Sequence, residues 1–467
     1  MASSKLLKNT DLTSGPILPQ MILFSLPLML TGILQLLFNT ADTIVVGRWG
    51  GATPDECENA LAAVGSCGAL IGIIVNFFLG LSVGAGVCVA QDIGAKQHDE
   101  VEKVVHTSVV AALICGSAVA LIGSVLCRPL LALMGTDPAV LDQAAPYMRA
   151  YFLGAPACMV YNYCASILRS KGDTTHPLLF LTLAGCANVL MNLVMVLVFG
   201  LGAVGVGIAT ATSHWVSCVL VVLHMTRLED SCRLDLKKLR IHPEKLRKML
   251  YIGIPAGIQS TVFSFSNVLI QSSINTFGKA TVAANTAAGN ICDYVYMAQN
   301  SLYHATLTFV GQSVGARRYE RIRPVVLTAV AVVTVVGLSL SSVVLLFGPE
   351  LISIFSPGNP EVSRIGMIRI LYLGVPYFLA GIMEIGSGLL RGLGRSIHSM
   401  VVAIMGSCVF RVIWILTVFA YFRSLESLYL SYPISWALTA AAHFTLAIIA
   451  LKKLKQPTPK TELLRIT

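Results

Sequence analysis

The sequence predicts an all-α integral membrane protein with twelve transmembrane helices, arranged as two parallel six-helix repeats. Three observations lead to this fold class. Only 12% of the 467 residues are charged and 55% are hydrophobic, whereas about 25% of residues are charged in a soluble protein. Apolar stretches occur that are long enough to cross about 30 Å of hydrocarbon. The first half of the chain also recurs in the second half, which is typical of transporters.

The twelve predicted spans follow one another along the chain with mostly short connections. The first stretch contains no small-residue cleavage site, so we interpret it as a retained helix and not as a signal peptide. The first six spans cover residues 20–46, 60–89, 104–127, 140–168, 177–200 and 202–226. The second six cover residues 246–274, 281–310, 325–347, 362–391, 397–422 and 426–452.

The internal repeat is clearest in two loops that each follow the second span of a half. QDIGAKQHDEV begins at Gln91 and QSVGARRYERI begins at Gln312, so that Gly94 matches Gly315. Other segments pair in the same way, LGAP with LGVP and ILRSKGDT with LLRGLGRS. A duplicated hydrophobic chain predicts a two-lobed transporter whose substrate site lies between the repeats.

The hydrophilic stretch between the sixth and seventh spans is the predicted boundary of the two halves. We predict an N-terminal lobe at 1–227, a basic cytoplasmic linker at 228–248, and a C-terminal lobe with a short basic tail at 249–467. An even number of spans in each half makes the two repeats parallel.

The distribution of positive charge predicts the orientation in the membrane. Of the 33 lysine and arginine residues, 25 lie in segments on the side of the termini, 7 lie on the other side, and Arg411 lies within a span. Such an excess marks the cytoplasmic side, so both termini are expected to be cytoplasmic in a multi-pass protein of the inner (plasma) membrane. The net charge of +10 is spread over loop ends that face anionic membrane lipids, and no nucleic-acid partner is expected.

Polar residues in the spans of the first half predict a cation-coupling site. Gln35, Asn39 and Asp42 are spaced i, i+4 and i+7 in the first span, which places them on one helix face. A carboxylate within a span is costly unless it faces a cavity, binds a cation or carries a proton. Asn188 and Asn192 in the fifth span reach a similar depth. The alternative is a hydrogen-bond network that only holds helices together.

The second half has a different set of polar residues. Asp293 lies in the eighth span, Glu384 in the tenth and Arg411 in the eleventh. One interpretation pairs a carboxylate with Arg411, and the other makes both carboxylates attraction points for a cationic substrate. The predicted substrate-binding residues are Asp293, Glu384, Asn290, Met297, Asn267 and Gln259.

Several classes of protein are excluded by absent motifs. The sequence contains no HExxH, no DDxxD and no GxxxxGK[ST], and its 12 cysteines lack CxxC spacing. We therefore expect no catalytic residues, no bound metal and no cofactor apart from a coupling ion, H⁺ or Na⁺.

On these residues the chain resembles the multidrug and toxic compound extrusion (MATE) transporters of bacterial type. The resemblance runs from PLMLTGILQLLFNTADTIVVGRWG through QDIGAK and QSVGAR to PISWALTA, nearly the whole chain. It implies two lobes around a V-shaped central cleft, which alternates between inward-open and outward-open states. It also implies that the protein exports small organic cations or drugs by antiport with H⁺ or Na⁺; we expect it to act as a monomer.

The resemblance further implies roles for three residues of the first half. Asp42 matches the aspartate of the family's first helix, and Asn188 matches the asparagine of its fifth helix. Asn192 stands where many members carry a second aspartate, which favours H⁺ coupling through a single carboxylate over Na⁺ coupling. The alternative function is a lipid-precursor or polysaccharide flippase of the same superfamily, but its cavity should be strongly basic, whereas the second half offers Asp293 and Glu384.

Overall fold

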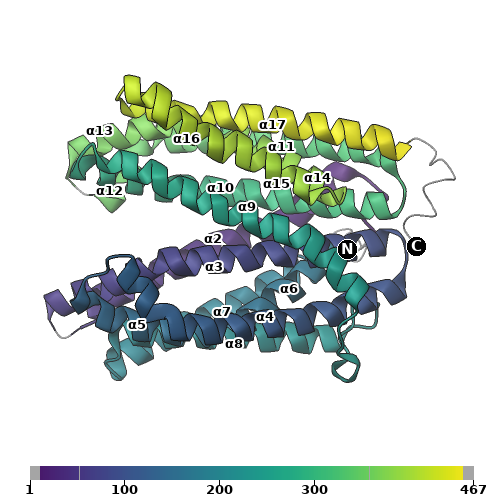
Figure 1. Cartoon of the computed structure of the whole chain (residues 1–467), viewed down its shortest axis with the longest axis horizontal. Helices are drawn as coiled ribbons and strands as arrows, with labels where there is room; N and C mark the ends of the chain where they lie inside the picture. The colour runs from purple at the N-terminus through teal and green to yellow at the C-terminus, as the bar shows by residue number, and fades with distance from the viewer. Residues whose placement is uncertain (1–10, 52, 357, 456–467) are drawn as a thin grey trace.

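The computed structural model describes residues 11–51, 53–356 and 358–455, and every regular element within them is a helix (Figure 1). The first half contains α2 (Ile17–Trp49), α3 (Pro54–Gly94), α4 (His98–Leu133), α5 (Pro138–Phe152), α6 (Ala155–Lys171), α7 (Thr175–Leu193) and α8 (Gly202–Thr226). The second half contains α9 (Pro243–Asn275), α10 (Lys279–Gly315), α11 (Tyr319–Leu346), α12 (Gly348–Phe355), α13 (Pro360–Arg369), α14 (Tyr377–Gly392), α15 (Ser396–Ala403), α16 (Phe410–Trp414) and α17 (Leu425–Lys455).

Each of the twelve predicted spans coincides with helical structure, although four of them are not single α-helices. The span predicted at 140–168 is divided into α5 and α6 at Leu153 and Gly154. Pro156 lies in the first turn of α6, where the absence of its N–H group costs no hydrogen bond, because N–H groups at a helix start have no partner within the helix. The spans predicted at 177–200, 362–391 and 397–422 each contain π-helical turns. Such turns insert an extra residue into the hydrogen-bond ladder.

Nine helices of the described residues are long and apolar enough to cross a membrane on length and composition alone. The three predicted spans outside this set are the divided pair α5–α6 and the helices α9 and α10. α9 and α10 carry rows of polar side chains, which lower their hydropathy; several of these side chains line the cavities described below.

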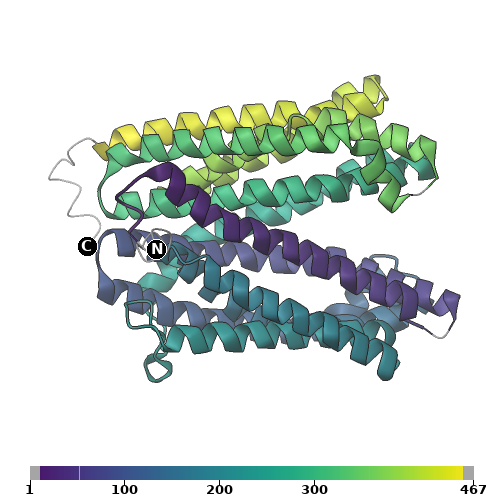
Figure 2. The same ribbon diagram turned by 180° about the vertical axis from the view of Figure 1, so that it is seen from behind.

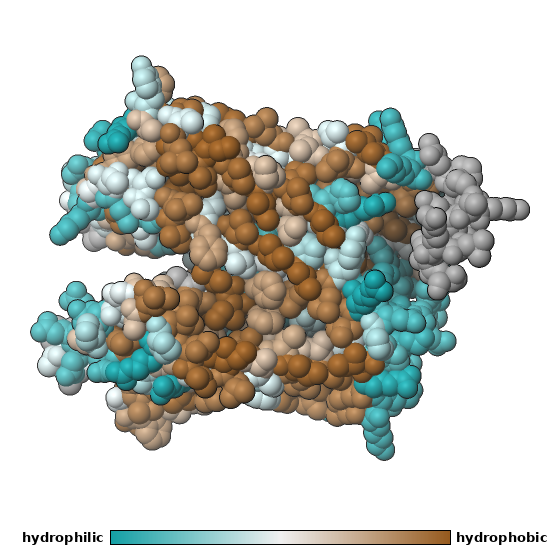
Figure 3. All heavy atoms as spheres, viewed as in Figure 1, coloured by the Kyte–Doolittle hydropathy of each residue, from teal (hydrophilic) through white to brown (hydrophobic). Residues whose placement is uncertain are grey.

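The outer surface carries the apolar belt expected of a membrane protein. Figure 3 shows a broad brown band around the middle of the molecule and hydrophilic residues at its two ends. Large apolar side chains of several helices are open on this surface, among them Leu121, Leu346 and Leu416, which are 69%, 74% and 71% exposed. Because so much exposed apolar surface would be unfavourable in water, it indicates contact with lipid.

Two helices cross between the halves. Figure 1 shows α9 running obliquely between the second half and the first. Figure 2 shows α2 running obliquely between the first half and the second on the opposite face. α9 packs against α3, and α2 packs against α10 as well as α7. The first helix of each half is therefore one of the elements through which that half contacts the other.

The halves separate at one end of the molecule and meet at the other. The space-filling view shows a deep gap at the end opposite the chain termini (left in Figure 3). At the end where the chain termini lie, the two repeated loop motifs meet each other. A Cβ atom added to Gly94 would lie 2.0 Å from the Gln312 carbonyl oxygen, and one added to Gly315 would lie 1.9 Å from the Gln91 carbonyl oxygen. Only glycine permits so close a backbone approach at both positions.

The repeated motifs also exchange hydrogen bonds in a symmetric pattern. Gln91 Nε2 donates to the Gly392 carbonyl oxygen of the second half at 3.1 Å. Gln312 Nε2 donates to the Ser170 carbonyl oxygen of the first half at 2.8 Å. Ser170 and Gly392 occupy matching positions in the repeated ILRSKGDT and LLRGLGRS segments. Four repeated segments, two from each half, thus form the closed end together.

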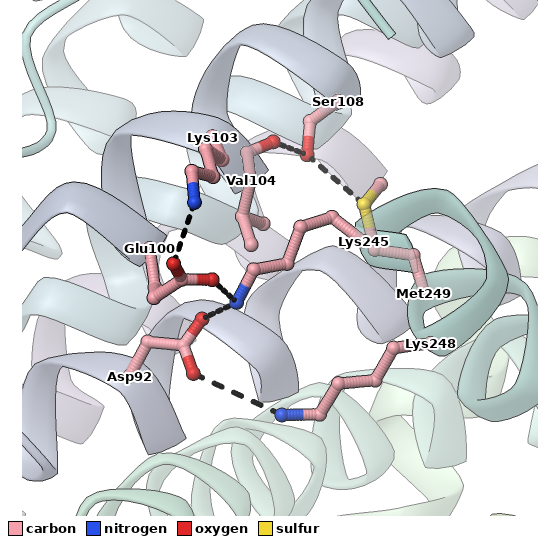
Figure 4. A network of polar contacts seen from close by, with 8 residues as sticks. All are labelled: Asp92, Glu100, Lys103, Val104, Ser108, Lys245, Lys248 and Met249. Carbon is pink, nitrogen blue, oxygen red and sulfur yellow. Dashed lines mark hydrogen bonds and ion pairs between the residues drawn. The ribbon is translucent and has the colours of Figure 1, made fainter. Parts of the chain in front are cut away.

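A partly buried ion-pair network reinforces the closed end (Figure 4). Lys245 at the start of α9 lies between two carboxylates of the first half, 2.8 Å from Asp92 and 2.8 Å from Glu100. Lys248 lies 3.8 Å from Asp92, and Lys103 lies 2.7 Å from Glu100. The Lys245 and Asp92 side chains are only 11% and 7% exposed, so their attraction is screened less than that of a surface pair.

We expect Gly94→Ala to lower the melting temperature of the purified protein in detergent. The added methyl group would collide with the Gln312 carbonyl, and overpacking of this kind costs about 1–3 kcal/mol. The matched control is Gly72→Ala in the same helix, because no atom lies within 4 Å of its added Cβ. That variant should melt at or slightly above the wild-type temperature. A Gly94→Ala protein as stable as the control would contradict the close contact.

Candidate functional site

A cavity of about 320 Å³ lies in the first half between α2, α6, α7 and α8. It contains four of the five residues that the sequence predicts for cation coupling: Gln35, Asn39, Asp42 and Asn188. The fifth, Asn192, is fully buried behind the cavity wall and reaches Asp42 with its side chain. The polar stripe of the first span therefore lies on one face, as its spacing predicts, and in the structure this face is directed toward the fifth span.

Asp42 stands at the end of a chain of amide hydrogen bonds. Asn192 Nδ2 donates to Asp42 Oδ1 and also approaches Asn188 Oδ1 at 3.4 Å. Asn188 Nδ2 in turn donates to the Thr210 hydroxyl of α8 at 3.5 Å. Because Asn192 directs its N–H group at the carboxylate oxygen, whereas Asn188 donates away from it to Thr210, the contact between Asn192 and Asp42 fits an ionised Asp42.

Asn192 also has an unsatisfied group. Its Oδ1 atom is buried and has no hydrogen-bond partner among the described residues. A buried acceptor without a partner is unfavourable by about 1–3 kcal/mol. A turn of the amide by 180° would bring this oxygen next to Asp42, which is stable only if a proton or a cation lies between the two oxygens. The turned orientation would therefore require one more positive charge at the site than the observed orientation does.

The sequence analysis missed polar residues that α6 and α8 contribute to this cavity. Thr210, Ser213, His214 and Ser217 are spaced at steps of 3 and 4 along α8, the same signal that identified the stripe of the first span. His214 Nε2 is buried and has no hydrogen-bond partner in the described part of the chain. α6 adds the further polar side chains Tyr161 and Asn162.

A second cavity, of about 390 Å³, lies in the other half between α9, α10, α14, α17 and the helices around Arg411. Asp293 and Glu384 both line it, together with Asn267. Its walls also include the aromatic rings of Phe263, Tyr296, Tyr377, Tyr432 and Trp436. Two carboxylates beside aromatic faces form an environment suited to an organic cation.

Arg411 lies in this cavity wall but is not paired with either carboxylate among the described residues. Its Nε donates to the Ser435 hydroxyl at 3.0 Å, and its guanidinium lies over the Tyr432 ring, 4.1 Å from the centroid. Of the two interpretations of Asp293 and Glu384, the ion pair with Arg411 is absent from this conformation. The carboxylates remain available to a ligand.

Three of the residues predicted to bind substrate lie outside this second cavity. Gln259 is buried and its Oε1 accepts a hydrogen bond from Arg391 Nη2 at 2.9 Å. Asn290 is exposed and lines neither cavity. Met297 lines the cavity of the first half, where its sulfur would lie 2.9 Å from a Cβ added to Gly32 of α2. The rotation of α9 and α10 about their axes is set by packing, so helical spacing alone did not separate these faces.

Comparison with known proteins identifies the family. Residues 27–194 and 255–417 match the MatE family, which is well over half of the chain. The "Probable multidrug resistance protein YoeA" of Bacillus subtilis is 27% identical over 433 residues, covering 90% of this chain and 91% of that protein. A protein of Shewanella oneidensis named "FAD transporter" is 25% identical over 462 residues, covering 96% and 98%.

Solved structures show the same fold. A crystal structure of MATE in complex with MaL6 has a TM-score of 0.89 at 22% identity and covers 96% of this chain and 100% of that chain. A MOP superfamily transporter from Pyrococcus furiosus, described as having a binding pocket of reverse polarity, has a TM-score of 0.88 at 23% identity and covers 96% and 99%. The predicted fold of twelve membrane helices in two lobes is thereby confirmed. This chain belongs to the MatE family, and it is a multi-pass membrane transporter of the MATE type and not an enzyme.

Proposed function

We propose that this protein is a secondary active efflux transporter that exports small organic cations or drugs by antiport with H⁺ or Na⁺. In this proposal it acts as a monomer in the plasma membrane with both termini in the cytoplasm, so that the cleft in Figure 3 opens to the outside. The observation that carries the proposal is the Asp42 carboxylate in the cavity of the first half, held by the Asn192 amide. Several relatives, including YoeA, are named as multidrug resistance proteins.

The coupling step begins with an ionised Asp42. A proton or Na⁺ that enters through the open cleft neutralises the carboxylate, which then no longer attracts the Asn192 donor. The amide turns, and its unsatisfied oxygen gains a partner. The chain offers one carboxylate in this cavity, which favours H⁺ as the coupling ion.

The charge state of Asp42 affects the other half through a movement of α2. This helix carries both Asp42 and Pro27, and Pro27 interrupts its hydrogen-bond ladder and provides a point of bending. Gly32 of α2 lies against Met297 of α10, the helix that also carries Asp293. A shift of α2 on neutralisation of Asp42 therefore displaces the helix that lines the second cavity. Antiport then follows as a coupling free energy between ion and substrate.

Alternating access also requires the closed end to open. We propose that residues 1–227 and 249–467 move as the two lobes and that residues 228–248 connect them, with α9 already beginning at Pro243 inside this connection. Opening would separate Gly94 from Gly315 and break the contacts of Lys245 with Asp92 and Glu100. The ion pairs would thus favour the outward-open state in the absence of ligands.

A second candidate substrate is an anionic compound with an aromatic ring system. The observation that favours it is Arg411, whose guanidinium faces the second cavity without a carboxylate partner in the described residues. A relative that aligns with 96% of this chain is named an FAD transporter. The lipid-precursor flippase is less well supported, because the acids Asp293 and Glu384 line the same cavity.

We expect Asp42→Asn to reduce efflux of a fluorescent organic cation from proteoliposomes by about tenfold or more, a loss within the usual range of coupling energies. Asparagine keeps the shape of the side chain but cannot alternate between charged and neutral forms. Efflux should be measured with a Na⁺ gradient and with a pH gradient, imposed separately, which identifies the ion. Asp142→Asn is the control, because that carboxylate is 70% exposed and pairs with Arg128 on the surface. Wild-type efflux by Asp42→Asn would contradict the proposal.

We expect Asn192→Asp to create a site that Na⁺ stabilises. The substitution places a second carboxylate next to Asp42, and two adjacent carboxylates repel each other unless a cation lies between them. The melting temperature of the variant should rise with NaCl and not with choline chloride at equal ionic strength. The wild-type protein should show the smaller difference between the two salts. An equal response of both proteins would argue against Asn192 as the residue that selects the ion.

We expect Asp293→Asn and Glu384→Gln to weaken binding of a cationic dye by about fivefold or more each, because each removes one charge that attracts the dye inside a cavity. Glu350→Gln, on the exposed surface of α12, should leave the affinity unchanged. The measurement is fluorescence anisotropy of the dye with protein in detergent. If FAD displaces the dye and Arg411→Gln prevents that displacement, the anionic substrate is favoured instead.

A further inference from the structure

Three potential metal ligands meet at the closed end of the first half, away from both cavities. Asp173 lies in the turn between α6 and α7, His176 in the first turn of α7, and His224 in the last turn of α8. Their ligand atoms all lie within 4.8 Å of one another. None of the three belongs to the predicted cation-coupling or substrate-binding residues.

The carboxylate of Asp173 is oriented toward the two imidazole rings. Its Oδ1 accepts a hydrogen bond from the backbone N–H of His176 at 3.1 Å, which fixes the side chain at the start of α7. Its Oδ2 lies 2.6 Å from Nδ1 of His176 and 3.8 Å from Nε2 of His224. One oxygen therefore stands between the two ring nitrogens, and the other is held by the backbone. A carboxylate supported in this way is typical of a metal ligand.

His224 has a ring nitrogen without a hydrogen-bond partner beside Asp173, among the described residues. Its Nε2 atom is buried and has no hydrogen-bond partner among the described residues, because 3.8 Å to Asp173 is too long for a hydrogen bond. The two imidazole rings stack with centroids 4.1 Å apart, and Phe180 covers them on one side. The unpartnered nitrogen thus points into a small polar site beside an apolar wall.

The spacing of the ligand atoms is close to that of a tetrahedral zinc site. With zinc–ligand bonds of about 2.0 Å, neighbouring ligand atoms of a tetrahedron are about 3.3 Å apart. The observed separations of 2.6 Å and 3.8 Å lie on either side of this value. The His176 side chain is 45% exposed, so its ring can turn away from the stack and direct a nitrogen toward a shared ion.

The surrounding charges permit a cation at this place. Lys171 is the nearby ammonium group, and it is already paired with Asp230 in the segment that follows α8. The Lys171–Asp230 pair is neutral as a unit, so the Asp173 carboxylate is left to offset part of the charge that an ion would add. Two imidazoles and one carboxylate are the ligand types that Zn²⁺ and its neighbours in the first transition row prefer.

From these observations we propose that Asp173, His176 and His224 form a binding site for a divalent metal ion of the zinc class, with water as the fourth ligand. The ion would connect the turn between α6 and α7 to the end of α8, directly before the segment that leads to the second half. Its role is structural: it holds the closed end of the first half together. The site does not depend on the proposed substrate or on the coupling ion.

The test is titration of Zn²⁺ into full-length protein without a histidine tag, stripped with a chelator and kept in detergent, followed by isothermal calorimetry. We expect one equivalent of tightly bound Zn²⁺ per chain. His224→Ala and His176→Ala should each weaken binding by at least about tenfold, the loss that even an outer-shell partner of a metal can cause. His398→Ala is the matched control, because this histidine is exposed on α15 at the same end of the molecule.

A second measurement excludes misfolding as the cause. Zn²⁺ should raise the melting temperature of the wild-type protein and of His398→Ala, and it should not raise that of His224→Ala. Asp173→Asn gives an independent variant, because asparagine can still accept the hydrogen bond from the His176 backbone N–H but lacks the anionic ligand; it too should bind Zn²⁺ more weakly. The proposal is overturned if the wild-type protein binds no Zn²⁺ saturably, or if His398→Ala loses binding as fully as His224→Ala.

Discussion

The structure depends on one close approach of backbones, where the repeated motifs of the two halves meet. Gly94 and Gly315 each face a carbonyl of the opposite motif at a distance that no side chain would allow. Because α3 and α10 are held together at this end, the halves can diverge only at the other end, where the cleft opens (Figure 3). The duplication in the sequence is therefore also the contact that determines the shape of the molecule.

A second constraint comes from polar groups placed among membrane helices. Carboxylates in such helices are tolerated when they face a cavity or accept hydrogen bonds, and Asp42 does both. Asp293 and Glu384 face a cavity of their own in the other half. The two cavities lie in different halves, yet Met297 of α10 lines the cavity that contains Asp42. Helix α10 is thus exposed to changes at both cavities, which is the physical requirement for coupling between them.

Features that depend on local spacing could be predicted from the sequence. Contacts between side chains of different helices could not, because they depend on how each helix is rotated against its neighbours. Apolar length located the spans, and the spacing i, i+4 and i+7 placed Gln35, Asn39 and Asp42 on one helix face, which lines one cavity. The partnership of Gln259 with Arg391 joins residues 132 positions apart, and no periodicity indicates it. The same holds for His224, which approaches Asp173 from a separate helix. That the repeated motifs contact each other was also not predicted, since a repeat indicates similar structure and not contact.

We propose that the repeated-motif end and the cleft end open in alternation. The most direct measurement is the distance between paired spin labels at each end, by double electron–electron resonance in nanodiscs. Gln97→Cys with Glu320→Cys reports on the closed end, and Glu58→Cys with Glu361→Cys on the cleft, after replacement of the accessible native cysteines Cys57, Cys115 and Cys186. We predict that conditions that shorten the cleft distance lengthen the distance at the closed end. Two distances that shorten together, or a closed-end distance that stays fixed while the protein transports its substrate, would contradict it.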